Sequence, residues 1–261
     1  MLNLIQIRKR HYDHQRNKLI NMDANIDDWK FSPYNCLKAR IYIELSSIVV
    51  FFLQYTNVSP NQVTFLYVLS GILGGVLLSL NNQTLIIIGC LIIFFKGVLD
   101  WADGLLARIK EQTSSIGHIL DAWGSNVGYI FFISGLTVYC YNLTNNSFYL
   151  FILIIFLIFK SIDFKNYLYQ QSFYEISNKT GNIESKILEK NEIKEKKENF
   201  LYKFIKSSMD DRARTTDSVL LIILLNFFYD LDKLIELIVL LYFIKSMIIF
   251  LGHIYFFTKK K

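Results

Sequence analysis

Cysteine and histidine are scarce in this chain, with three and four copies among 261 residues. Cys36, Cys90 and Cys140 have no metal-ligand spacing and form no even set, so we expect packing residues of a reducing or membrane environment. No Cys/His set suits zinc. No apolar segment follows the short charged start, so we expect no cleavable signal peptide.

Apolar residues are abundant instead: they make up 52% of the sequence, with 22 Phe. A soluble domain of this size would not need several long apolar runs, so the composition predicts an all-α, polytopic membrane helical bundle. The formal charge of +6 is expected to come from cytoplasmic loops facing anionic lipid, not from a nucleic-acid partner.

The apolar runs predict six transmembrane helices. A shorter run at 41–55, interrupted by Glu44, predicts an interfacial helix before them, with Trp29 and Tyr34 as anchors; a membrane-crossing helix stays open as the alternative. We expect a cytoplasmic arm and juxtamembrane helix over 1–57 and a membrane domain over 58–257, with a cytoplasmic loop at about 171–211. The predicted spans are 62–80, 84–107, 116–139, 147–165, 216–230 and 234–257.

The connections between these spans differ in charge. The loops at 81–83 and 142–147 have no Lys or Arg, whereas the opposite side carries the basic N-terminal arm, the lysine-rich stretch 179–206 and the terminal lysines. The positive-inside rule therefore predicts a protein of the inner cell membrane with both termini in the cytoplasm. Small residues at four-residue spacing, Gly71 with Gly75 and Gly124 with Gly128, predict close helix packing.

One stretch places charge at the edge of very apolar sequence. Asp100, Asp103 and Arg108 end one apolar run, and Asp121 lies near the start of the next. A charge at the centre of a membrane helix costs roughly 2.5–3.5 kcal/mol on insertion scales, so ionisable groups here are functional candidates. Marking of the membrane boundary is the alternative for each residue alone.

The spacing of these residues indicates a chemistry. Asp100 and Asp103 share a helix face, and a short polar turn brings Asp121 back on an antiparallel helix, so the three carboxylates can converge. Hard oxygen ligands suit Mg²⁺ or Mn²⁺. Arg108 suits phosphate oxygens. Gly104 and Gly117 would let a ligand approach the backbone.

The pattern Asp-x-x-Asp-Gly-x-x-Ala-Arg, then eight residues and Gly-x-x-x-Asp, resembles the signature of the CDP-alcohol phosphotransferase (CDP-alcohol phosphatidyltransferase) family of integral membrane enzymes. The segment 59–64, Ser-Pro-Asn-Gln-Val-Thr, also resembles the start of the family's first membrane helix. The likeness covers roughly residues 29–257. The positions that match the signature are Asp100, Asp103, Gly104, Ala107, Arg108, Gly117 and Asp121.

The resemblance implies a transferase. A hydroxyl of an acceptor alcohol would attack a CDP-linked donor, either CDP-diacylglycerol or a CDP-polyol, and CMP would leave. By the same resemblance Asp100, Asp103 and Asp121 would hold metal and nucleotide, and Asp121 would be catalytic. The CDP pocket would be lined by Asp103, Gly104, Ala107, Arg108, Gly117, Asn61 and Thr64. Membrane lipids are further expected partners, and a homodimer is left open.

Ser125 stands where the family signature has its last Asp, the proposed general base. A serine can still coordinate Mg²⁺, and His118 is an alternative base on nearly the same helix face. The substitution leaves two functions open: an active transferase, or a catalytically impaired member that binds CDP-alcohol. A transporter or channel is a more distant alternative. Arg212 and Arg214 are candidates for an acceptor phosphate, with positive-inside flanking as their alternative.

Overall fold

The computed structural model describes residues 2–20, 33–162 and 213–259, and these ranges contain helices and no strand. The predicted all-α class is therefore confirmed. The helices are α1 (Leu4–Ile20), α2 (Pro33–Leu53), α3 (Pro60–Leu78), α4 (Gln83–Ile109), α5 (Ser115–Thr144), a helix at Phe148–Ile162, α9 (Ala213–Leu225) and α10 (Asp232–Lys259).

Four of these helices are long and apolar enough to cross a membrane, which indicates an integral membrane protein. The helix Phe148–Ile162 and the apolar segment Thr216–Leu225 are shorter than a span over the residues described, so the count of six stays a prediction. The four candidate spans are Pro60–Leu78, Gln83–Ile109, Ser115–Thr144 and Asp232–Leu251.

The N-terminal region contains more helix than the sequence predicted. Helix α1 lies in a stretch described above only as polar and basic, and α2 starts at Pro33, eight residues before the predicted 41–55 helix. Trp29 and the loop at about 171–211 lie outside the described residues. Tyr34, the other predicted anchor, is 42% exposed in α2.

The chain divides into two compact units. Unit 1 comprises Met1–Leu77 and Ile88–Phe132, and unit 2 comprises Leu78–Ile87 and Ile133–Lys261. This division does not test the predicted boundary between residues 57 and 58, which stays a prediction.

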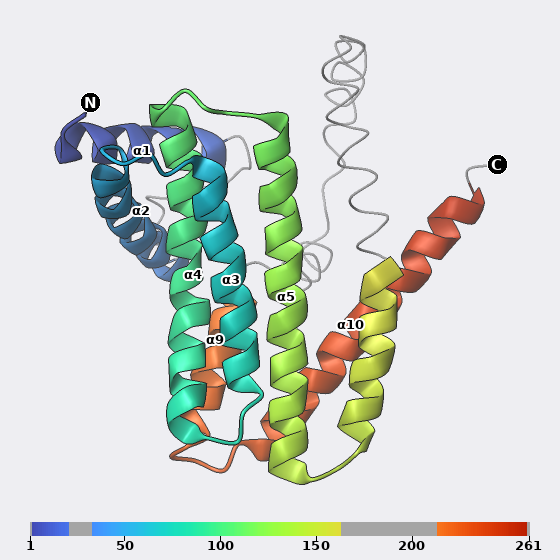
Figure 1. Cartoon of the computed structure of the whole chain (residues 1–261). Helices are drawn as coiled ribbons and strands as arrows, with labels where there is room; N and C mark the ends of the chain where they lie inside the picture. Colours follow the sequence, from blue (N-terminus) through green and yellow to red (C-terminus); the bar gives the residue numbers. More distant parts are fainter. Residues whose placement is uncertain (1, 21–32, 163–212, 260–261) are drawn as a thin grey trace. The chain divides into compact units, whose positions relative to one another are not determined.

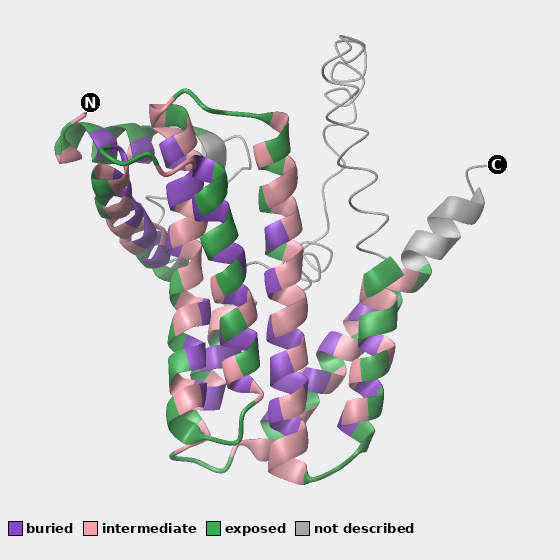
Figure 2. Cartoon of the chain, in the orientation of Figure 1, coloured by how far each residue is buried: buried purple, intermediate pink, exposed green. Residues whose placement is uncertain are grey.

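In unit 1, α1 runs across the end at which α3 begins and α4 ends (Figure 1). Ile7 of α1 is fully buried in a core with Val50, Val63 and three residues of α4, namely Ala102, Leu105 and Leu106. Buried faces of α3, α4 and α5 are visible in Figure 2. Because the residues beside the aspartates are packed against α1, the N-terminal helix helps to fix the motif on α4.

The glycines of unit 1 allow α3 and α5 to pack closely. A Cβ on Gly71 would lie 3.0 Å from the Cα of Gly128, and one on Gly75 would overlap the backbone of Phe131. Side chains at these two positions would push the helices apart, which agrees with the predicted packing role.

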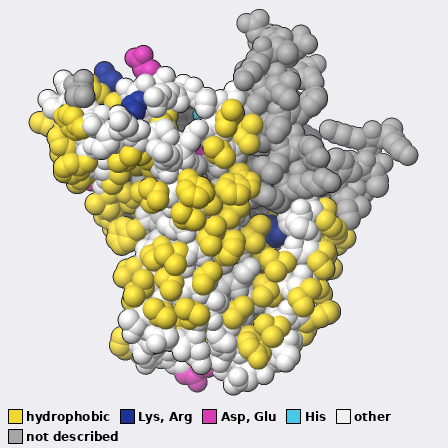
Figure 3. Space-filling view, viewed as in Figure 1, with side chains coloured by type: hydrophobic (Ala, Val, Ile, Leu, Met, Phe, Trp, Pro, Cys, Tyr) yellow, Lys and Arg dark blue, Asp and Glu magenta, His cyan; other side chains and the backbone are white. Residues whose placement is uncertain are grey.

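The outer surface of unit 1 is apolar along its helices. Phe65, Leu66 and Leu73 of α3 and Leu91 and Phe95 of α4 are 44–58% exposed, and hydrophobic side chains spread over this face in Figure 3. Basic side chains appear near α1 and at one place lower on the same face. Such a surface suits a lipid environment.

Unit 2 joins its helices through neutral and paired polar groups. Asn226 donates to Tyr139 Oη (3.3 Å) and Asp232 Oδ1 (2.9 Å), and Tyr149 donates to Glu236 Oε2 (2.6 Å). These contacts satisfy polar groups between packed helices, which is their structural role.

Candidate active site

A pocket in unit 1 lies where α3 and α5 begin and α4 ends. It encloses about 470 Å³ of empty space, part of it open to solvent. Eight residues of the predicted site line it: Asn61, Thr64, Asp103, Gly104, Ala107, Arg108, Gly117 and Asp121. Pro60, Gln112, Thr113, Ser114 and His118 complete the lining.

Local capping fixes the two helix starts at this pocket. The backbone N–H of Ser59 donates to Gln62 Oε1 (2.8 Å), and Pro60 takes the first helical position of α3, a capping arrangement with proline where no N–H is needed. Ser114 Oγ accepts from the N–H of Gly117 (3.0 Å) and caps α5. Both helices thus direct their partly positive N-terminal ends towards the pocket region.

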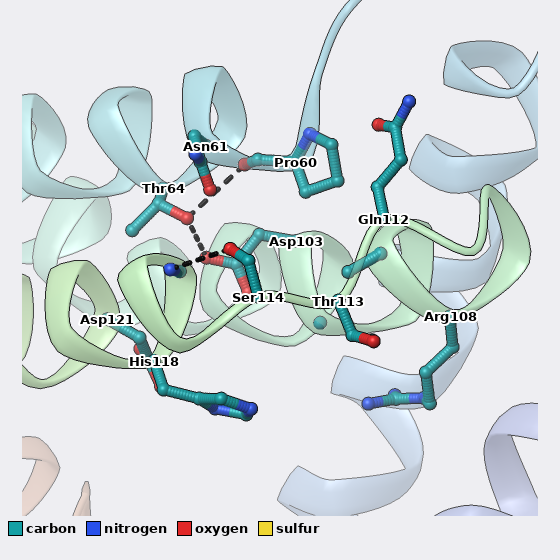
Figure 4. Close-up of a pocket in the computed structure, with 13 residues that line it drawn as sticks. Pro60, Asn61, Thr64, Asp103, Arg108, Gln112, Thr113, Ser114, His118 and Asp121 are labelled. Carbon is teal, nitrogen blue, oxygen red and sulfur yellow. Dashed lines mark hydrogen bonds between the residues drawn. The ribbon is translucent and has the colours of Figure 1, made fainter. Parts of the chain in front are cut away.

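Asp103 is buried, and its carboxylate is turned towards α3. The hydroxyl of Thr64 donates to Asp103 Oδ2 at 2.6 Å, and Figure 4 shows the two side chains pointing at one another. Arg108, one turn further along α4, attracts the same carboxylate. Thr64 is therefore the hydrogen-bond donor to Asp103 within the chain, and Arg108 offsets part of its negative charge.

Asp100 and Asp121 form a separate pair. Their carboxyl groups lie within hydrogen-bonding reach of each other across α4 and α5. Asp121 is exposed and lines the pocket, whereas Asp100 is more enclosed and does not. Two carboxylates so close repel one another unless a proton or a cation lies between them.

The fit to a metal ion depends on this pair. Within the ranges described, no three His, Cys, Asp or Glu side chains are grouped to hold a metal ion, because Asp103 faces Thr64. The predicted three-carboxylate set is thus not assembled as a group. The paired oxygens of Asp100 and Asp121 still fit one divalent ion, since Mg²⁺ is usually bound by one or two carboxylates together with substrate phosphates.

The remaining predicted residues differ in their placement. Arg108 and His118 are exposed and extend from α4 and α5 on the same side of the pocket (Figure 4). A Cβ on Gly117 would lie 3.4 Å from Asn61 Oδ1, so the glycine gives room beside Asn61. Arg212 lies outside the described residues, as does the side chain of Arg214.

Ser125 does not line the pocket. Its hydroxyl lies close to that of Tyr67 on α3. The aromatic ring of Tyr67 in turn has the ammonium group of Lys96 5.3 Å from its centre.

Sequence reasoning missed Tyr67 and Lys96. The signal for Lys96 was available, since it is a lone charge in an apolar run, four residues before Asp100 and therefore on the same helix face. Tyr67 had no such signal, because its contact with Ser125 depends on how α3 packs against α5.

The comparisons with known proteins give one family match. Residues 57–175 match the family model described as CDP-alcohol phosphatidyltransferase. This match supports the assignment of the segment to the CDP-alcohol phosphatidyltransferase family. A comparison with curated proteins gives no match.

The CDP-alcohol phosphatidyltransferase match covers α3, α4, α5 and the helix Phe148–Ile162, and so includes every residue that lines the pocket. Helices α1 and α2 precede it. The family supports a transferase of phospholipid biosynthesis, with a CDP-alcohol donor and an alcohol acceptor.

Proposed function

We propose that this protein is a membrane transferase that moves a phospho-alcohol group, phosphatidyl or phospho-polyol, from a CDP-linked donor to an acceptor alcohol and releases CMP. The observation that carries the proposal is the pocket: it collects Asp103, Arg108, Gly117 and Asp121 from two helices, within the segment that matches the family. Asn61 and Thr64 add a third helix to the same lining.

The pocket suits the diphosphate of the donor. The guanidinium group of Arg108 offers parallel donors to phosphate oxygens, and the starts of α3 and α5 favour negative charge nearby. Gly104 and Gly117 lack side chains, so a nucleotide can approach the backbone of α4 and α5.

Asp100 and Asp121 are the residues that would hold Mg²⁺ or Mn²⁺, with Asp103 beside them. A divalent ion bound there would polarise the phosphoryl group and offset charge on the leaving CMP. The protein's own contribution is mainly to position reactants and stabilise charge, as in other phosphoryl transfers.

The reaction forms one bond and breaks one. The acceptor oxygen bonds to the phosphorus that carries the alcohol group, the bond from that phosphorus to the CMP oxygen breaks, and CMP leaves with the electron pair. The proton of the acceptor hydroxyl goes to Asp121, the exposed carboxylate of the lining. We place the pocket and both termini on the cytoplasmic side of the inner membrane, where the basic stretches of the sequence favour them. Arg212 and Arg214 remain our proposed contacts for a phosphorylated acceptor.

The test is CMP release by purified protein in lipid nanodiscs, with CDP-diacylglycerol and CDP-polyols as donors and a panel of acceptor alcohols. The expected result is CMP and a phosphodiester product, identified by mass spectrometry, with wild type but not with Asp121→Asn. Asp232→Asn, in unit 2, is the matched control and should retain activity. No CMP release with any donor that binds would reject the transferase function.

One observation favours the second function, a non-catalytic member that binds CDP-alcohol: Ser125 lies close to Tyr67 and is not among the residues that line the pocket. Ser125→Asp separates the two. In a working variant site, the added carboxylate repels the donor diphosphate and CMP release falls. In a retired enzyme, a restored general base would raise turnover by about 10²–10⁴-fold.

A further inference from the structure

Lys96 is a charged residue of α4 close to the motif that the proposed function leaves unused. It lies well inside the candidate span Gln83–Ile109, where an ammonium group is costly and is a functional candidate by default. It also contacts residues of two other helices of unit 1, α3 and α5, so its position is defined by packing.

The structure makes room for the ammonium group. A Cβ on Gly128 of α5 would lie 2.5 Å from Lys96 Nζ, and one on Gly71 of α3 would lie 3.7 Å from it. Tyr67, whose ring centre is 5.3 Å from Nζ, provides an aromatic face, which attracts a cation. Two glycines and one aromatic ring therefore accommodate a single lysine tip at the crossing of α3 and α5.

This position is adjacent to the aspartate pair. Lys96 lies one turn before Asp100 on α4, and the two side chains attract each other. Asp100 in turn faces Asp121. On α5, Gly128 follows Ser125 by one turn, and Ser125 lies close to Tyr67. Lys96 therefore lies beside the Asp100–Asp121 pair, near Ser125. The family signature has a carboxylate at the position of Ser125, and this chain has none there.

The charges then limit how many metal ions the site can hold. The carboxylate of Asp103 is turned towards Thr64 and accepts its hydrogen bond, so Asp100 and Asp121 are the carboxylates left for a cation. Lys96 offsets one of these two negative charges. One divalent ion, with two positive charges, more than offsets the remaining negative charge. The site then has a net positive charge that favours an anionic donor. Among the residues described, no third carboxylate joins this pair in a metal-binding group that could hold a second divalent ion.

We propose that Lys96 is a positioning residue whose fixed positive charge takes the place of a second divalent ion beside Asp100 and Asp121, so that the site binds one divalent ion per chain. This rests on the proposed function, because it specifies the ion content of the same site. Lys96 acts through Asp100 and does not itself line the pocket.

The test is Mn²⁺ binding to the full chain in nanodiscs with CDP present, measured by electron paramagnetic resonance of the free ion. Wild type should bind one Mn²⁺ per chain. Lys96→Met should bind Mn²⁺ at least about tenfold more tightly, because it removes a like charge from beside the ion in a poorly screened interior. Lys245→Met, a lysine of α10 in unit 2, is the matched control and should leave Mn²⁺ binding unchanged.

Lys96→Gln, which keeps a polar group of similar length, replaces the methionine variant if that variant does not fold. Two Mn²⁺ ions per wild-type chain, no Mn²⁺ binding at all, or an affinity that neither Lys96 variant changes would overturn the proposal. CMP release distinguishes this result from the proposed function. If the protein releases CMP but binds two Mn²⁺ ions, only the role of Lys96 is rejected. If it binds one Mn²⁺ ion and the Lys96 variant binds Mn²⁺ more tightly, but no CMP is released, only the transferase function is rejected.

Discussion

The two compact units use buried polar groups in opposite ways. In unit 2, Asn226 donates to both Asp232 and Tyr139, so these polar groups have partners within the protein. In unit 1, Asp100 and Asp121 bring like charges together beside a pocket. Polar groups that hydrogen-bond to one another stabilise the fold. Two carboxylates held close together favour the binding of a ligand that relieves their repulsion. The difference separates residues that hold the bundle from residues that bind a ligand.

The largest expected effect comes from removing one member of the like-charge pair. Asp100→Asn should lower CMP release by more than the roughly 10–100-fold typical of losing only an outer partner of a metal ligand. Its melting temperature should not fall, because the change relieves repulsion with Asp121. Thermal unfolding and the CMP assay, run on the same preparation, measure both. A destabilised but active variant would break the comparison.

His11 sharpens the comparison from within unit 1, because it is buried as a neutral, satisfied group. It is fully buried on α1, hydrogen-bonded to Ser46 (3.2 Å) and Gln15 (3.3 Å), with its ring 5.8 Å from that of Trp101. Burial, with the charge of Arg108 nearby, lowers the pKa of His11 from 6.5 to about 3. The folded state therefore binds the proton more weakly than the unfolded chain does.

Because the folded pKa is depressed, stability is unaffected above pH 6.5 and falls as the pH drops from there towards about 3. At pH 5 the loss should be on the order of 2 kcal/mol. Hydrogen exchange of α1 should accelerate over this range in wild type and not in His11→Gln, with His14→Gln as control. The same acceleration in His11→Gln would show that another group is responsible.

The smallest effect is expected in unit 2. Asn226→Ala removes the donor to Asp232 and the acceptor for the N–H of Leu231 (2.7 Å), so it should cost about 1–3 kcal/mol of stability. Nucleotide binding should be unchanged. The comparison would be wrong if this variant lost CDP binding while keeping its melting temperature.

Much of the pocket could be predicted from the sequence because it depends on local geometry. A three-residue spacing sets two aspartates on one face of α4, and a short turn returns the chain to Asp121. The capping residues Ser59 and Pro60 likewise mark where α3 begins.

What could not be predicted depends on packing between helices. Helix α1 has a narrow buried face of Ile7, His11 and Gln15, two of them polar, so its hydrophobic periodicity is weak. The turning of Asp103 towards Thr64 needs the register of α3 against α4. The place of Lys96 at Gly128 needs that of α4 against α5.

The most direct test of the central claim is CDP binding by isothermal titration calorimetry to wild type and Asp121→Asn, each in Mg²⁺ and in chelator. The account predicts that wild type binds CDP in Mg²⁺ and not in chelator, and that Asp121→Asn binds CDP under neither condition. Equal affinity of wild type for CDP in Mg²⁺ and in chelator would contradict it.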